Sequence, residues 1–451
     1  MIIIEFTNFL KNAAHVKPSP EQYSLLRENP FYAFVHFSPN TYTGLEWGDG
    51  TEDPTIFNPT ELDCDQWAQA IKSAGMTGMV LTAKHHDGFC LWQTEYTEHS
   101  MKNSPYKNGK GDIVREAAEA CKRHGLKFGF YLSPWDRNCP LYGTDEYNTF
   151  YKNQLTELLT NYGEIFHVWF DGACGEGPNG KKQVYDFDGY IELIKKYQPN
   201  ATIFNDAGTV RWIGNEAGQA PYAQWAVVPH ELCFMNEPQT EGPLMEGSLD
   251  FVYNSDINIG SLSNIIYSKG LVFAPAETDM SIRPGWFYHP DEEPHSLERL
   301  YNTYLTSVGN NATFNLNIPP MPNGRFDQRD VDRLKELGDL INQELGENKI
   351  KDSTVEKLHG HGPTQPEYQV TLKETQTIKY VEVAENIKEG QRVESFDVFY
   401  KDNTGLWSKL GGGTTIGSRK IVKIPPHDIK GILVRITSSR DVPDIEWIKA
   451  Y

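Results

Sequence analysis

The sequence has few cysteines and no long hydrophobic run. Its 451 residues include six cysteines and no Cys-x-x-Cys pair, so neither a zinc ribbon nor a disulfide scaffold is indicated. We expect the cysteines to be mostly free thiols. No apolar stretch approaches the roughly 20 residues that a membrane-spanning helix needs. We therefore expect no membrane insertion.

Basic residues are also scarce relative to acidic ones. The chain has 42 Lys and Arg against 61 Asp and Glu, which gives a net charge of −19. A surface this acidic repels nucleic-acid phosphates and anionic lipid headgroups, so we expect no nucleic-acid partner and favour a neutral ligand. The apolar segment Met1–Phe6 lacks the basic region and cleavage site of a signal peptide. Localisation stays open, and is periplasmic or secreted if a signal peptide has been removed.

No G-x-G-x-x-G follows a strand and no G-x-x-x-x-G-K-[ST] occurs, which argues against a doubly wound nucleotide-binding fold. Instead, strand-like and helical segments alternate from about Phe31 to Leu345. About eight such repeats predict a (β/α)₈ barrel in the α/β class. The expected strands are Phe31–Phe37, Met79–Ala83, Lys127–Leu132, Ile165–Phe170, Ala201–Phe204, Gln224–Val228, Leu271–Phe273 and Thr313–Asn315. The expected helices are Asp65–Ala74, Asp112–His124, Tyr147–Asn161, Phe187–Tyr197, Ser296–Val308 and Gln328–Leu345.

The pattern changes to a period of two from about Ile350. Short alternating segments separated by turn residues predict a C-terminal antiparallel β-sandwich. We divide the chain into a barrel over residues 1–348 and a sandwich over 349–451, and expect the boundary near His359–Pro366, which has little helical or strand character. The expected strands are Gln376–Val383, Ser395–Tyr400, Lys420–Ile424 and Gly431–Ile436.

Polar residues follow the first four expected strands, where barrels assemble their active sites. Asp171 follows the fourth strand; such an Asp can simply form a turn, but its place favours a catalytic carboxylate. His85 and His86 follow the second strand and are either a hydrogen-bonded core pair or metal ligands. Neighbours on a strand point to opposite faces and chelate one ion poorly, which favours hydrogen bonding to a polyhydroxylated ligand.

A second candidate carboxylate, Glu216, lies in the glycine-flanked loop 211–218. Most Glu residues in loops are solvated. Here Trp212 and the glycines could let the loop fold over a pocket and desolvate the acid, which raises a carboxyl pKa toward that of a general acid. Carboxylates, histidines and tryptophans together suit a neutral sugar.

Four blocks of this sequence resemble the signature blocks of glycoside hydrolase family 29, the retaining α-L-fucosidases. They are Phe34-Val-His-Phe37, Val80-Leu-Thr-Ala-Lys-His-His-Asp-Gly-Phe-Cys-Leu-Trp92, Gly125-Leu-Lys-Phe-Gly-Phe-Tyr-Leu-Ser133 and Val168-Trp-Phe-Asp-Gly172. The resemblance covers about residues 29–345. It implies a barrel followed by a β-sandwich, a two-step covalent mechanism without metal or cofactor, and fucosylated oligosaccharides or glycoconjugates as partners.

The resemblance also implies roles for individual residues. It makes Asp171 the nucleophile and Glu216 the acid/base. If Glu216 does not have the latter role, the nearby Glu176, Glu231 and Glu237 are the next carboxylates to test. Blocks at Ser133–Arg137, Trp212–Gly218 and Ser281–His289 resemble the branch selective for α-1,3- and α-1,4-linked fucose. The implied sugar-binding residues are His36, Glu46, Trp47, His85, His86, Tyr131, Trp169 and Trp286.

Two other interpretations of the same residues are open. One is a metal-dependent barrel hydrolase with His36, His85, His86 and Asp171 as ligands. The other is a carbohydrate-binding protein that has no catalytic activity.

Overall fold

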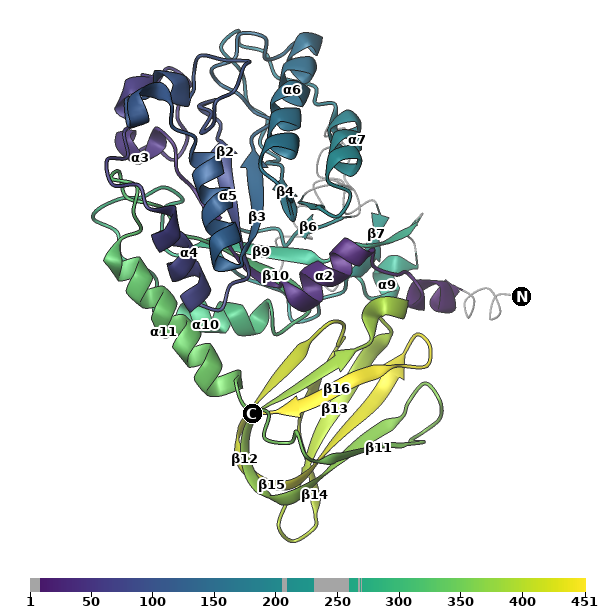
Figure 1. Ribbon diagram of the computed structural model, residues 1–451. Coiled ribbons are helices and arrows are strands. Elements are labelled where there is room, and N and C mark those ends of the chain that lie inside the picture. Colours follow the sequence, from purple (N-terminus) through teal and green to yellow (C-terminus); the bar gives the residue numbers. More distant parts are fainter. Residues whose placement is uncertain (1–8, 205–208, 231–258, 267, 269) are drawn as a thin grey trace.

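A computed structural model describes residues 9–204, 209–230, 259–266, 268 and 270–451. The chain forms a helix-surrounded parallel sheet followed by a separate antiparallel sheet, which lies below it in Figure 1. Within the described residues, no helix is long and apolar enough to cross a membrane. The five cysteines described are free.

The parallel sheet has eight strands in the order β5-β4-β3-β2-β1-β10-β9-β6. An isolated bridge between Phe204 and Val210 joins its two ends, so the sheet is a nearly closed barrel, as predicted. The strands are β1 (Phe31–Val35), β2 (Gly78–Lys84), β3 (Lys127–Leu132), β4 (His167–Trp169), β5 (Thr202–Phe204), β6 (Arg211–Trp212), β9 (Ala276–Ser281) and β10 (Ala312–Asn317).

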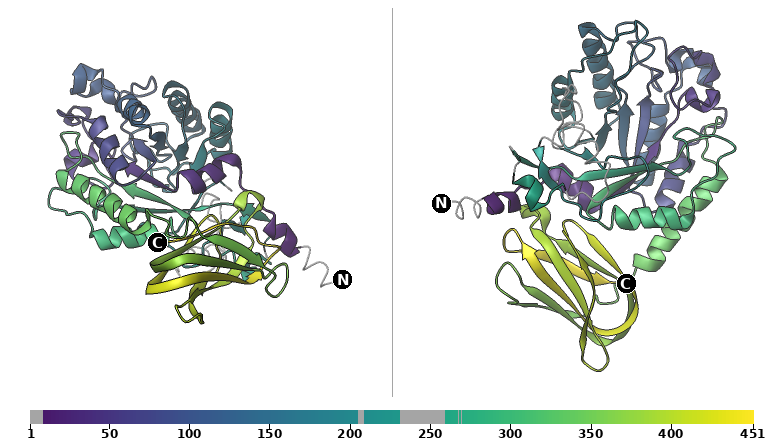
Figure 2. Two further views of the ribbon diagram at one scale, coloured as in Figure 1. Left: turned by 60° about the horizontal axis from the view of Figure 1, so that its bottom comes forward. Right: turned by 180° about the vertical axis from the view of Figure 1, so that it is seen from behind.

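Helices surround this sheet (Figures 1 and 2). Their ends follow capping rules: Asp112 accepts a hydrogen bond from the Arg115 backbone N–H at the start of α5, and Gly125 ends that helix with a left-handed φ of 70°. The helices are α2 (Pro20–Glu28), α3 (Asn40–Thr43), α4 (Cys64–Ser73), α5 (Ile113–His124), α6 (Asp145–Asn161), α7 (Phe187–Tyr197), α9 (Leu262–Ile265), α10 (Leu297–Thr306) and α11 (Gln328–Leu345). Short 3₁₀ turns occur at Pro54–Ile56, Met101–Asn103, Tyr106–Gly109 and Ile387–Glu389.

Two of the expected strands do not belong to the barrel. Residues Val227–Pro229 (β7) and Leu271–Phe273 (β8) pair antiparallel with each other in a separate two-stranded sheet. Their places in the barrel are taken by β6 and β9, which the sequence did not predict. The sequence of β9, Ala276-Glu-Thr-Asp-Met-Ser281, carries two carboxylates in a fully buried strand. An expectation built on apolar runs therefore passes over it.

The C-terminal domain is the predicted antiparallel β-sandwich. Its six strands are hydrogen-bonded to one another in one continuous sheet. Its strands fold around a core of aliphatic and aromatic side chains that includes Val370, Val398 and Ile432. The expected strands at 420–424 and 431–436 are one long strand, and the segment expected at the domain boundary, 359–366, joins two strands inside this sheet. The strands are β11 (Thr354–Leu358), β12 (Glu367–Glu385), β13 (Val393–Lys401), β14 (Trp407–Gly413), β15 (Lys420–Ser439) and β16 (Ile445–Ala450).

Buried polar side chains join the sandwich to the barrel. Lys420 of β15 is 2% exposed. Its Nζ donates to the Tyr222 carbonyl at 2.7 Å and to Asn310 Oδ1 at 2.6 Å. Gln391, also buried, accepts from the Ala226 backbone N–H at 2.8 Å. The Tyr222 hydroxyl donates to the Gly412 carbonyl at 2.6 Å. The sandwich thus holds the segment 222–226, which follows Glu216, by hydrogen bonds.

Candidate active site

Asp171 lies just beyond the carboxyl end of β4, at the end of the barrel where the sequence places the site. The Tyr131 hydroxyl donates to Asp171 Oδ2 at 3.0 Å, and the Ala173 backbone N–H donates to Oδ1 at 2.7 Å. His86 Nε2 lies 3.7 Å from Oδ2. The Asp171 side chain is 23% exposed. The carboxylate is therefore held by donors on two sides and still reachable by a ligand.

Three histidines form a buried group beside Asp171. His36 Nδ1 is 2.9 Å from Asn317 Oδ1, and His86 Nδ1 is 2.7 Å from Ser133 Oγ. Desolvation lowers the pKa of His36 to about 3 and lowers the pKa of His85 well below its ordinary value. Desolvation also lowers the pKa of His86, against the attraction of Asp171. Neutral imidazoles at this position can exchange hydrogen bonds with uncharged hydroxyl groups.

Aromatic rings complete the walls of the site. Trp169 stacks on Phe204 with ring centroids 4.1 Å apart and lies 5.2 Å from the Tyr131 ring. Trp286 lies 5.0 Å from the His36 ring. Trp47 meets the His86 ring edge-on at 5.5 Å and is 58% exposed. Such a large exposed ring beside buried polar groups is available to stack on a ligand.

Glu216 reaches the same site from the loop after β6. Trp286 Nε1 donates to Glu216 Oε2 at 3.1 Å. The residue is exposed overall, but partial desolvation raises the pKa of its carboxyl, and the negative charges of Asp171 and Glu46 raise it further. The hydrogen bond from Trp286 opposes these effects. Two carboxylates that influence each other, one of them with a raised pKa, suit paired acid and nucleophile chemistry.

Glu46 contacts the loop that carries Trp286 at two points. Its Oε2 accepts the Trp286 backbone N–H at 2.9 Å, and its Oε1 lies 2.7 Å from His289 Nε2. The ten residues that we predicted as catalytic or sugar-binding are thus connected by direct contacts in one cluster. Of the further carboxylates, Glu176 is exposed and its carbonyl accepts from Trp135 Nε1, whereas Glu231 and Glu237 lie outside the described residues.

The sequence did not nominate several polar residues that support this cluster. Asn317 binds His36 and also donates to the Trp286 carbonyl at 2.8 Å. Glu277 and Asp279 of β9 are buried below the site. The signal that could have found these two acids is their alternation in a short segment that follows a proline, which is typical of a strand with one polar face.

No group of three or more His, Cys, Asp or Glu suited to hold a metal ion occurs in the part of the chain that is described. The geometry thus gives no support to the metal-dependent interpretation.

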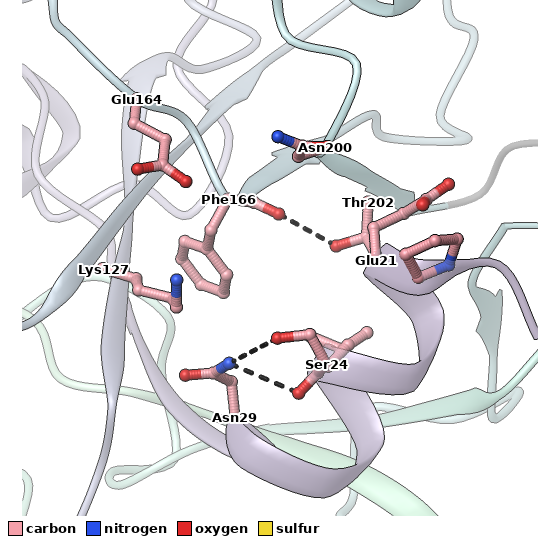
Figure 3. Close-up of a pocket in the computed structure, with 10 residues that line it drawn as sticks. Glu21, Ser24, Asn29, Lys127, Glu164, Phe166, Asn200 and Thr202 are labelled. Atoms are coloured by element: carbon pink, nitrogen blue, oxygen red, sulfur yellow. Dashed lines mark hydrogen bonds between the residues drawn. The ribbon is translucent and has the colours of Figure 1, made fainter. Parts of the chain in front are cut away.

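A cavity of about 240 Å³ opens at the other end of the barrel (Figure 3). Lys127, Phe166 and Thr202 line it at the amino-terminal ends of strands, together with Ser24 of α2 and Asn29, which follows that helix. None of the nominated residues contributes to it. In barrel proteins this end serves stability, and the carboxyl end carries the chemistry.

Comparisons with known proteins identify the family of the chain. A family model described as alpha-L-fucosidase matches residues 26–345. The chain is 37% identical over 447 residues to Alpha-L-fucosidase 1 of Arabidopsis thaliana, which covers 93% of this chain and 84% of the relative. It is 32% identical over 169 residues to the plasma alpha-L-fucosidase of Homo sapiens, which covers 35% of this chain and 34% of the relative.

Solved structures give the same result. A putative alpha-L-fucosidase from Bacteroides ovatus superposes with a TM-score of 0.89 at 42% identity, covering 99% of this chain and 76% of the other. A Ruminococcus gnavus fucosidase of glycoside hydrolase family 29, solved in complex with fucose, superposes with a TM-score of 0.83 at 29% identity. That match covers 97% of this chain and 95% of the other.

Proposed function

The chain belongs to the α-L-fucosidase family of glycoside hydrolases, and from this premise we propose that it releases α-1,3- and α-1,4-linked fucose from branched glycans with retention of configuration. The observation that carries the mechanism is the pairing of Asp171 with Glu216. Asp171 follows strand β4 and accepts a hydrogen bond from Tyr131, whereas Glu216 lies on a loop and the pKa of its carboxyl is raised. A retaining glycosidase needs one ionised and one protonated carboxyl group around a single anomeric carbon.

In the first step, an Asp171 oxygen attacks the anomeric carbon of fucose and forms an ester bond. The bond from that carbon to the glycosidic oxygen breaks, and Glu216 transfers its proton to the departing oxygen. In the second step, Glu216 takes a proton from water. The water oxygen then bonds to the anomeric carbon, the ester bond breaks, and Asp171 is regenerated.

The remaining site residues bind the sugar in this proposal. His36, His85 and His86 exchange hydrogen bonds with fucose hydroxyls as neutral imidazoles, and Tyr131 orients Asp171. Trp169 and Trp286 pack against the apolar side of the ring. Trp47 and Glu46 lie at the rim, where the exposed indole can contact a neighbouring sugar.

The linkage preference rests on the Ser133–Arg137 block and on the contact between Trp286 and Glu216. Arg137 donates to the Gly48 carbonyl at 2.7 Å and so fixes the loop of Trp47 beside the pocket. A second sugar bound there contributes binding energy that lowers the chemical barrier.

The test compares kcat/KM for a Lewis-type trisaccharide with that for 2′-fucosylated lactose. We expect the trisaccharide to be preferred and the first product seen by NMR to be α-L-fucose. A preference for the α-1,2 linkage would refute the proposed linkage specificity. β-L-fucose as the first product would refute the retaining mechanism.

A further inference from the structure

Strand β9 carries two carboxylates that point into the barrel and have no role in the proposed chemistry. Glu277 and Asp279 are alternate residues of the strand, 0% and 2% exposed. Alternate residues of a strand face the same side and are about 6.6 to 6.8 Å apart. The strand lies between β10 and β6, so its backbone is fixed on both edges.

Glu277 holds the strand end that leads to Asp171. The Trp169 Nε1–H donates to Glu277 Oε1 at 2.8 Å, and Asn315 donates to the same oxygen at 3.1 Å. The Tyr32 hydroxyl donates to the other oxygen. Trp169 is two residues before Asp171, and its ring also packs against Tyr131, which binds the Asp171 carboxylate. Glu277 therefore fixes Trp169, which precedes Asp171 in the chain and packs against Tyr131.

Asp279 holds the loop that carries Glu216. The Trp212 Nε1–H donates to Asp279 Oδ1 at 2.9 Å. The Ile213 backbone N–H donates to the Glu277 carbonyl at 2.9 Å, and Ala217 bridges to Met280 farther along the same strand. Glu216 thus lies in a short segment that is tied to β9 on both sides.

We propose that Glu277 and Asp279 are positioning residues that set the spacing between the two catalytic carboxyl groups. Each acts through the indole N–H of a tryptophan that precedes one of these groups: Trp169 for Asp171, and Trp212 for Glu216. The inference rests on the proposed roles of Asp171 and Glu216. The inference goes beyond those roles, because it assigns the relative placement of Asp171 and Glu216 to the single strand β9.

The two halves of this arrangement have different kinetic signatures. A displaced acid costs most when the leaving group is a poor one, since only then is protonation needed. A displaced nucleophile slows the first step for every substrate. The dependence of kcat/KM on leaving-group pKa therefore distinguishes the two residues from each other.

The experiment measures kcat/KM for a series of aryl fucosides whose phenols increase in pKa. Trp212→Phe removes the N–H that binds Asp279. We expect a loss of 20- to 100-fold with the least acidic phenol and under threefold with the most acidic. Asp279→Ala should show the same dependence as Trp212→Phe. Asp279→Asn keeps an oxygen that can accept the hydrogen bond, so its kcat/KM should stay within threefold of the wild-type value for every substrate. Glu277→Ala should lower all values by a similar factor of at least ten.

Trp447→Phe is the matched control. Like Trp212, Trp447 is half-buried. Its Nε1–H donates to the buried carboxylate of Glu382 at 2.8 Å, but both residues lie in the sandwich. Trp447→Phe should leave kcat/KM unchanged for every aryl fucoside of the series. Circular dichroism checks the fold of every variant, and Trp212→Phe is decisive if Glu277→Ala does not fold.

Glu216→Ala, measured on the same series, separates this inference from the proposed function. If Glu216→Ala steepens the dependence and Trp212→Phe does not, the positioning role is refuted and the acid assignment stands. If Glu216→Ala itself leaves the slope unchanged, the acid assignment fails and the role of Asp279 fails with it.

Discussion

Replacing Asp171 by Ala should abolish turnover while leaving the fold intact. The side chain is 23% exposed and makes two hydrogen bonds, to the Tyr131 hydroxyl and the Ala173 backbone N–H. Each contributes about 0.5 to 1.5 kcal/mol. Water can reach both donors in the variant, and the repulsion between Asp171 and Glu216 disappears. We therefore expect the free energy of unfolding to fall by no more than about 2 kcal/mol.

The expected effect on catalysis is larger. Loss of the covalent step should lower kcat/KM by at least about 1000-fold, which corresponds to about 4 kcal/mol of transition-state stabilisation. Urea unfolding and fucose release give the two numbers on the same preparation. Activity within about tenfold of wild type, a barrier change of about 1.4 kcal/mol, would refute the nucleophile role.

Azide provides a stereochemical check on the same variant. In Asp171→Ala the small anion can attack the anomeric carbon from the side left open by the carboxylate, which forms a carbon–nitrogen bond as the glycosidic bond breaks. The product should be β-fucosyl azide. In Glu216→Ala, azide instead attacks the ester to Asp171 and should yield the α-anomer. The opposite pair of products would exchange the two roles.

Three further predictions follow from other buried or paired groups. Because the pKa of Glu216 is raised, the alkaline limb of the pH profile of kcat/KM should lie above the ordinary range of a glutamate; Glu216→Gln should abolish that limb and slow oligosaccharide hydrolysis by about 10²- to 10⁴-fold. His36, with its pKa lowered to about 3, stays neutral in the fold while the unfolded chain binds a proton below about pH 6.5. Its contribution to stability is complete above that pH and falls by up to about 1.4 kcal/mol per pH unit as the pH drops toward 3, so urea unfolding of His36→Asn should show a shallower acid decline. Lys84 and Asp136 form a buried ion pair at 2.9 Å, and Lys84→Met should lower the free energy of unfolding by about 3 to 5 kcal/mol; a loss under 1 kcal/mol would show that Asp136 does not need this partner.

Sequence patterns predicted the helices that have one apolar face and the buried strands that consist of a mostly apolar run. The helix at Gln328–Leu345 was predicted with its correct bounds, because Asp327 caps it and leucines mark one face. The strand that leads to Asp171 was found because its apolar residues are followed by a carboxylate and a glycine. These local signals also sufficed to nominate the histidines at the barrel mouth.

The polar interior of the barrel could not be predicted in this way. Glu277 and Asp279 are buried because tryptophan, asparagine and tyrosine side chains from other strands donate to them, and those partners are 38 to 245 residues away in sequence. A burial rule based on hydropathy assigns such acids to the surface. The same rule favoured the apolar segments of β7 and β8 as barrel strands. Glu46 was nominated by resemblance alone, and its contacts with Trp286 and His289 depend on a loop more than 200 residues away.

The buried polar junction between the barrel and the sandwich has a consequence for how the protein melts. Lys420 and Gln391 would each lose their partners if either domain unfolded alone, and a buried polar group without a partner is costly. The two domains should therefore lose structure together, as one peak in differential scanning calorimetry with a calorimetric enthalpy that matches the van't Hoff value. Removal of the sandwich should therefore free the segment after Glu216 from these contacts and loosen the loop that carries Glu216.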